Sequence, residues 1–292
     1  MSPDDSLVVC HLFQDASAIL LWGACSYLFA CVPSTLSSAI IEQMRTVFRV
    51  AASILLLAIT VAFPVQSAFV RDGWVDAANL SSMNGVLFET SIGPVWFAHA
   101  LLSLAIILTA MLSAARIGPL ALFSGLFLSC HDFFGHAVRL QGMASWALHL
   151  SYLLHVLAAA AWLGALVRFI AILRKAGSHL QNDSALAMRN FSTVGHYVVG
   201  CIVFTGLLNA WLIHGRLWPV IWSSLYDHLL TAKVLVVLSM VIVAVCNRYI
   251  IVPKLKHEPR AARALFWLGC TGVVLGRVGF VLVNVFSTLD QA

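Results

Sequence analysis

Long apolar runs recur along the whole chain and are separated by short polar connections. A helix that crosses a hydrocarbon core of about 30 Å needs about 20 apolar residues. The pattern predicts about eight such helices, at residues 6–31, 46–70, 93–114, 118–138, 145–173, 190–214, 226–250 and 264–288. The longest connections are 71–92 and 174–189, so we expect a single integral membrane domain over 1–292, an all-α polytopic bundle.

Composition supports a membrane protein and excludes several other classes. Hydrophobic residues make up 61% of the chain and charged residues only 10%, with a mean hydropathy of +0.94, whereas soluble domains carry about 25% charged residues. The start, MSPDDS, lacks a basic n-region, so the first apolar run is expected to be a retained span. The chain contains no Walker, GxSxG or HExxH motif, so we expect no nucleotide partner and no enzyme activity.

Basic residues indicate the orientation, because Lys and Arg concentrate in cytoplasmic loops. One set of connections and span ends carries Arg45, Arg49, Arg116, Arg168, Arg174, Lys175, Arg189, Arg248, Lys254, Lys256, Arg260 and Arg263. The alternate connections carry Arg71, Arg139 and Arg216. This bias predicts that both termini are periplasmic. The net charge of +5 then marks the cytoplasmic loops and gives no reason to expect a nucleic-acid partner.

Histidines are the main candidates for chemistry. His131, His136, His149 and His155 fall within 25 residues, and most of the eleven histidines map to the predicted outer side. A neutral imidazole is the commonest metal ligand, and an ionisable side chain in a span usually faces the bundle interior. Gly135, beside His136, indicates a break in the helix that would let both His131 and His136 turn inward.

His149 and His155 are six residues apart, which on a regular helix corresponds to about 240° and about 9 Å of rise. They cannot both bind one ion on an unbroken helix, so one faces a different neighbour or a second site. The small residues after His155, in VLAAAAWLG, favour close helix packing and place His155 in the bundle interior. Its alternative role is that of a buried histidine bonded to a backbone carbonyl.

Polar residues also interrupt the first predicted span. Offsets of three and four residues put His11, Gln14 and Asp15 on one helix face. A carboxylate inside a span costs about 2.5–3.5 kcal/mol and is normally paired or functional. Asp15 could orient His11 or bind a cation, and the alternative is a structural pair with Lys233 or Arg277.

Three phrases in order, GHAVRLQGMASWALHLSYLLHVLAAAAWLGAL, RNFSTVGHYVVGCIVFTGLLNAW and YDHLLTAKVLVVLSMVIVAVCNRYIIVPKL, resemble the CopD/PcoD copper-resistance membrane protein family of bacteria. The resemblance is best over 120–256 and weaker over 1–115, where FQDASAILLWGA carries it. It implies an inner-membrane protein that moves copper from periplasm to cytoplasm, often beside a periplasmic copper-binding partner. Carried over by position, it marks Gly135-His136-Ala137, His155, Trp162-Gly164, Phe191-Ser192, Gly206, Asn209, Lys233 and Pro253.

Three functions remain open from the sequence. The first is a copper permease in the lipid bilayer whose metal ligands come from His136, His155, His131, His11, Asp15 and His149; imidazole with Met or Cys suits Cu(I), and imidazole with carboxylate suits Cu(II). The second is a redox protein that holds haem b between two histidines. The third is a membrane partner subunit that binds no metal.

Overall fold

In the computed structural model, every regular element of the described chain is helical. The structure describes residues 2–71, 73–112, 117–130, 142–173, 181–214 and 225–251, with 254, 263–264, 267–268, 270–272, 274–276 and 278–279. The main helices are α1 (Pro3–Ala30), α2 (Ser34–Val70), α4 (Ile92–Leu112), α5 (Ile117–Ser129), α6 (Met143–Leu173), α7 (Gln181–His214) and α8 (Leu225–Cys246). A 3-10 turn, Asp76–Ala78, and α3 (Leu80–Glu89) lie between α2 and α4, and a π-helix, Asn247–Ile251, follows α8.

Six helices of the described chain are long and apolar enough to cross a bilayer, in α1, α2, α4, α6, α7 and α8. They fall on six of the predicted spans. α5 is shorter, with 13 residues, and its predicted span, 118–138, runs on beyond the described residues. The last predicted span, 264–288, is described only in part. The prediction of a polytopic helical bundle is therefore confirmed, while the count of eight stays a prediction.

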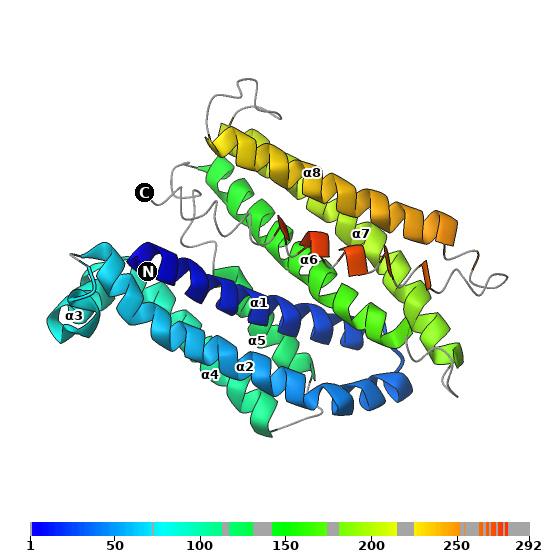
Figure 1. The fold of residues 1–292 in the computed structure, drawn as a ribbon, viewed down its shortest axis with the longest axis horizontal. Helices are drawn as coiled ribbons and strands as arrows, with labels where there is room; N and C mark the ends of the chain where they lie inside the picture. Colours follow the sequence, from blue (N-terminus) through cyan, green and yellow to red (C-terminus); the bar gives the residue numbers. More distant parts are fainter. Residues whose placement is uncertain are drawn as a thin grey trace.

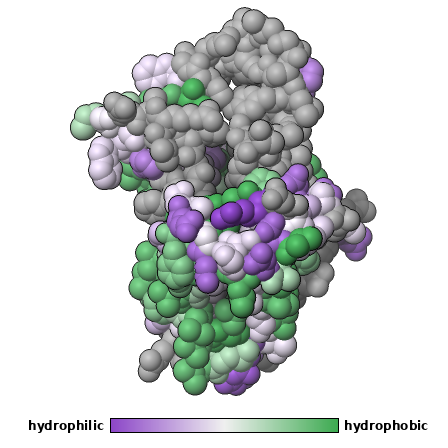
Figure 2. Space-filling view, turned by 90° about the vertical axis from the view of Figure 1, so that its left-hand side faces the viewer, coloured by the Kyte–Doolittle hydropathy of each residue, from purple (hydrophilic) through white to green (hydrophobic). Residues whose placement is uncertain are grey.

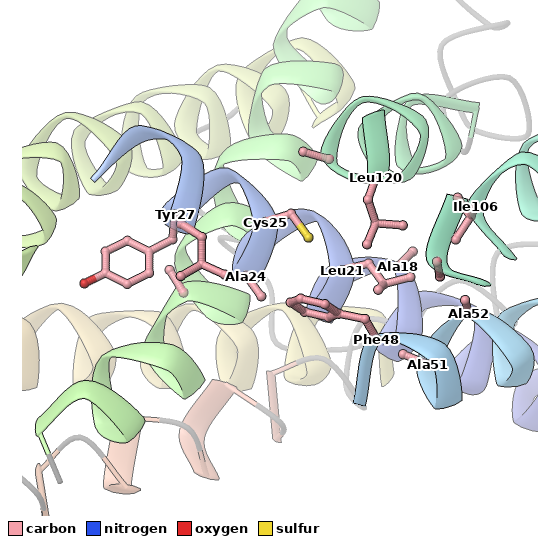
Figure 3. Packing of buried hydrophobic residues seen from close by; sticks show 14 of the residues in the cluster. Ala18, Leu21, Ala24, Cys25, Tyr27, Phe48, Ala51, Ala52, Ile106 and Leu120 are labelled. Atoms are coloured by element: carbon pink, nitrogen blue, oxygen red, sulfur yellow. The ribbon is translucent and has the colours of Figure 1, made fainter. Parts of the chain in front are cut away.

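α1 lies at the centre of the bundle, where it packs against α2, α5 and α6 (Figure 1). Its buried residues include Ala18, Leu21 and Ala24, which are completely shielded from solvent. Figure 3 shows them facing Phe48 of α2 and Leu120 of α5. The small residues on α1 let its neighbours approach closely, which is how helices associate in a bilayer.

Two glycines bring α1 and α6 into backbone contact. A Cβ added at Gly23 would stand 2.5 Å from the carbonyl oxygen of Ala160 and 2.6 Å from Cα of Gly164. A Cβ at Gly164 would stand 2.4 Å from the carbonyl oxygen of Ile19. Only glycine fits at both positions. The contact therefore sets the register between α1 and α6. The two helices run in the same direction (Figure 1).

α6 has α1 on one side and α7 on the other. The start of α7 is tied to the corner between α1 and α2 by two hydrogen bonds. Asn190 Nδ2 donates to the carbonyl oxygen of Cys31 at 3.0 Å, and Thr35 Oγ1 donates to Asp183 Oδ2 at 2.6 Å. The N-terminus of α1, the start of α6 and α3 lie at the other end of the bundle, which we call the α3 end (Figure 1).

The surface of the α3 end has a polar zone bordered by an apolar flank. Hydrophilic side chains gather across the middle of this end, and hydrophobic side chains cover the flank below it (Figure 2). Large apolar side chains also point outward along the helices, such as Leu57 at 63% exposure and Leu101 at 66%. Outward apolar side chains with polar ends are the arrangement expected of a bundle surrounded by lipid.

Candidate functional site

His11 and Asp15 lie on one stripe of α1. Their offsets from Trp22 are eleven and seven residues, so all three side chains fall within about 40° of one another on the helix. The indole N–H of Trp22 donates to the carbonyl oxygen of Leu157 on α6 at 2.9 Å. A Cβ at Gly125 of α5 would stand 2.9 Å from the Trp22 ring. The stripe therefore faces the place where α5 and α6 meet.

We call this place the α1–α5–α6 junction, defined by Trp22, Gly125 and Leu157. His11 and Asp15 continue its line toward the α3 end, and both side chains are half-buried. The Asp15 Oδ1 atom is buried. Gln14, which the sequence places on the same face, turns instead to α2, where its Nε2 donates to the carbonyl oxygen of Ala58 at 3.3 Å.

His149 lies on the side of α6 that meets α1. It precedes Ala160 and Gly164 by eleven and fifteen residues, which places it about 20° and 60° from them around the helix. It lies about 16 Å along α6 from Ala160, and His11 lies about 18 Å along α1 from Gly23. Gly23 also contacts Gly164, which lies about 22 Å along α6 from His149, so both histidines lie about 16–22 Å from this crossing, toward the α3 end.

His155 faces the opposite side of α6 and contacts α7. Its Nδ1 atom lies 3.0 Å from Oγ1 of Thr205, and a Cβ added at Gly206 would stand 3.3 Å from its Cε1 atom. One turn away, Ser151 Oγ donates to the carbonyl oxygen of Thr205 at 3.3 Å. His155 is half-buried where α6 packs against α7, and the side chain that it meets there carries a hydroxyl.

α6 is an unbroken helix, so the six-residue spacing places His149 and His155 about 240° apart around it. His155 lies about 8–14 Å along α6 from the Gly23 contact, and Asp15 lies about 12 Å along α1 from it. The two sides of α6 therefore carry candidate ligands at similar depth. Within the residues that the structure describes, no three His, Cys, Asp or Glu side chains come close enough to hold a metal ion.

His131 and His136 lie outside the described residues. The described chain stops at Cys130, a half-buried thiol just after α5, and resumes at Gly142 before α6. The two histidines thus belong in sequence to the connection between two helices of the α1–α5–α6 junction. Their role as ligands stays a prediction.

Sequence reasoning missed the place of His99 and the role of Thr205. His99 is 4% exposed; its Nε2 atom lies 3.2 Å from the carbonyl oxygen of Phe127, and the two rings are 4.4 Å apart. It therefore links α4 to α5. Thr205 is 3% exposed and is separated from His155 by 50 residues. The only signal for it in the sequence was its place one turn before Asn209 on α7.

Comparisons with known proteins agree with these observations. A family model described as "Copper resistance protein D-like, N-terminal domain" matches residues 2–146, and one described as "Copper resistance protein D" matches residues 185–286. The chain belongs to the copper resistance protein D family. The first match extends the resemblance over residues 2–115, where the sequence phrases were weaker.

Three curated relatives cover much of the chain. "Inner membrane protein YebZ" of Escherichia coli is 27% identical, over 94% of each chain. "Copper resistance protein D" of Pseudomonas syringae is 25% identical, over 78% of this chain and 79% of the relative. "Copper transport protein CutJ" of Bacillus subtilis is 28% identical over 61% of this chain, which spans 34% of that longer protein. No solved structure matches. The protein is a multi-pass inner-membrane protein with a copper-related function.

Proposed function

We propose that this protein conducts copper ions across the inner membrane from periplasm to cytoplasm. The observation that carries the proposal is His155, a half-buried imidazole held between α6 and α7 in a family named for copper. One relative is named a copper transport protein, which supports transport as the copper-related activity. A membrane potential would drive a cation inward by about 2.3 kcal/mol per charge per 100 mV, so no nucleotide site is required.

In this proposal the α3 end is periplasmic and both termini lie on that side. Its connections carry only Arg71, Arg139 and Arg216, against twelve basic residues in the other set, which supports this orientation. His131 and His136 receive copper at the mouth, together with His11, Asp15 and His149 at the α1–α5–α6 junction. His155, about 9 Å further along α6 than His149 and on its other side, is the next site inward. A periplasmic copper-binding protein supplies the ion.

The donor types fit copper in either oxidation state. Imidazole nitrogen with a carboxylate suits Cu(II), and imidazole with thiol or thioether sulfur suits Cu(I). The α1–α5–α6 junction offers His11, His149 and the Asp15 carboxylate, with Cys130 following α5. Copper here is the transported substrate.

Copper accumulation in cells that express the protein tests the proposal. We expect His155→Ala to reduce accumulation to the level of cells without the protein, while its abundance in the inner membrane is unchanged. His228→Ala is the matched control, because that imidazole is exposed on α8. Dissipating the membrane potential should lower accumulation by the unaltered protein.

Unchanged accumulation in the His155→Ala variant would overturn the proposed route. Metal analysis of the purified protein separates the other functions that the sequence left open. Bound copper without visible absorption from a porphyrin supports transport. Stoichiometric iron with a Soret band would replace the proposal by haem binding, and the absence of any bound metal would favour a partner subunit.

A further inference from the structure

The hydroxyl oxygen of Thr205 lies within hydrogen-bond distance of both the α7 backbone and the His155 ring. Oγ1 of Thr205 lies 2.6 Å from the carbonyl oxygen of Cys201 and 3.3 Å from that of Ile202. A hydroxyl has one hydrogen to donate, and a carbonyl oxygen can only accept. The Thr205 hydrogen is therefore committed to the backbone of α7, and Oγ1 can only accept from a third group.

That third group is His155 Nδ1, at 3.0 Å. Because Oγ1 accepts there, Nδ1 must carry a hydrogen. In a neutral imidazole one nitrogen is the donor and the other holds the lone pair, so the lone pair is on Nε2. Metal-binding histidines are oriented in the same way, by a hydrogen bond from the nitrogen that does not bind the metal.

The ring of His155 is also held in place around this bond. Cε1 stands against Gly206, where any added Cβ would be only 3.3 Å away. Ser151, one turn before His155 on α6, is 3% exposed and donates to the Thr205 carbonyl oxygen, which ties the two helices beside the ring. Thr205 itself is 3% exposed, so water does not compete for its hydroxyl.

We propose that Thr205 is a positioning residue that holds His155 as the Nδ1–H tautomer and so presents Nε2 to the copper ion. The inference rests on the proposed function, because it takes His155 as a ligand. It adds the binding atom and the residue that selects it. Thr205 does not touch the ion in this arrangement, and it acts only through the imidazole.

The tautomer can be measured without any metal. We would record ¹⁵N spectra of the purified, metal-free protein labelled at histidine, and assign the His155 signals by their loss in His155→Ala. The expected result is a protonated Nδ1 and an unprotonated Nε2. A protonated Nε2 with an unprotonated Nδ1 would overturn the proposal, and this result needs no Thr205 variant.

Copper binding provides the second readout. Thr205→Val keeps the shape but removes the acceptor, and loss of such an outer partner typically lowers metal affinity about 10- to 100-fold. Thr205→Ser keeps the hydroxyl and should retain both the tautomer and the copper affinity. If Thr205 acted only through the packing of its methyl group, Thr205→Ser would lower the affinity as well. Equal affinity and an equal ¹⁵N spectrum in Thr205→Val would refute the role of Thr205.

Copper binding by the two variants separates the ligand role of His155 from the positioning role of Thr205. If His155→Ala binds copper as tightly as the unaltered protein, the ligand role in the proposed function fails, whatever the tautomer. If His155→Ala loses copper but Thr205→Val does not, the proposed function stands and the positioning role is wrong.

Discussion

The backbone contact between α1 and α6 gives the sharpest test of the fold. Gly23→Ala would add a Cβ that stands 2.5 Å from the Ala160 carbonyl oxygen, 2.6 Å from Gly164 Cα and 2.9 Å from Gly164 N. All three atoms belong to the backbone of α6, so no side chain can turn away. Ordinary contact begins near 3.4 Å, so the helices must separate by about 1 Å.

The free-energy cost has two parts. Overpacking a close contact costs about 1–3 kcal/mol. A separation of about 1 Å would also lengthen the bond from Trp22 Nε1 to the Leu157 carbonyl oxygen, now 2.9 Å, beyond hydrogen-bond range. Loss of that bond adds about 0.5–1.5 kcal/mol. Together they predict that Gly23→Ala lowers the free energy of unfolding by about 2–4 kcal/mol.

Thermal unfolding of the detergent-purified protein measures this change, and we expect Tm to fall by about 3–7 °C for a chain of 292 residues. Gly200→Ala is the matched control: it is the same substitution inside a helix, but a Cβ there meets no described atom within 4 Å. It should raise the stability by up to about 1 kcal/mol. If Gly23→Ala were as stable as Gly200→Ala, the close crossing of α1 and α6 would be wrong.

Three further substitutions separate stability from copper binding. His99→Leu leaves the Phe127 carbonyl oxygen without its imidazole partner and should lower the free energy of unfolding by about 1–3 kcal/mol, measured by thermal unfolding. Copper affinity should be unchanged, and weaker copper binding would assign His99 to the site. Asp15→Asn removes a charge from the α1–α5–α6 junction and should lower copper affinity about tenfold or more without loss of stability, as measured by equilibrium dialysis. Equal affinity would mean that the carboxylate has only a structural role. Asn209 Oδ1 is buried and has no hydrogen-bond partner within the described chain, so Asn209→Leu should raise the free energy of unfolding by about 1 kcal/mol, and a fall would show that the amide is paired.

The spans could be predicted from the sequence because a bilayer demands an apolar run of fixed length. The start of α2 was the main error: the predicted span begins at 46, whereas the helix begins at Ser34. Glu42 and Arg45 ended the apolar run, yet the helix continues through them because Ile40 and Ile41 bury against the core on the other face. Hydropathy marks the lipid-crossing part of a helix and misses its amphipathic extension.

α3 was also hidden in a connection that looked irregular. Its one clear signal was Asn79, whose Oδ1 accepts from the backbone N–H of Ser81 at 2.9 Å as an N-cap. With ten residues, α3 is too short to produce a convincing apolar period. Short capped helices of this kind are recognised only when the capping residue is given weight.

Helical geometry was enough to predict the features of the site that depend on a single helix. The opposite directions of His149 and His155 follow from six residues on one helix, and the small residues after His155 indicated its burial. Its contact with Thr205 could not be derived, because the register between α6 and α7 depends on packing between distant segments. The same holds for the distances of His11 and His149 from the crossing of α1 and α6, which depend on the contact of Gly23 with α6.

The crossing of Gly23 and Gly164 also limits how chains of this family can be recombined. The first family match ends at residue 146, near the start of α6, and the second begins at 185, so Gly164 lies between the two. A chimera that exchanges residues 2–146 with those of a relative would replace one side of the crossing and keep the other. Such an exchange can assemble only where the donor segment also leaves room at the place of Gly23.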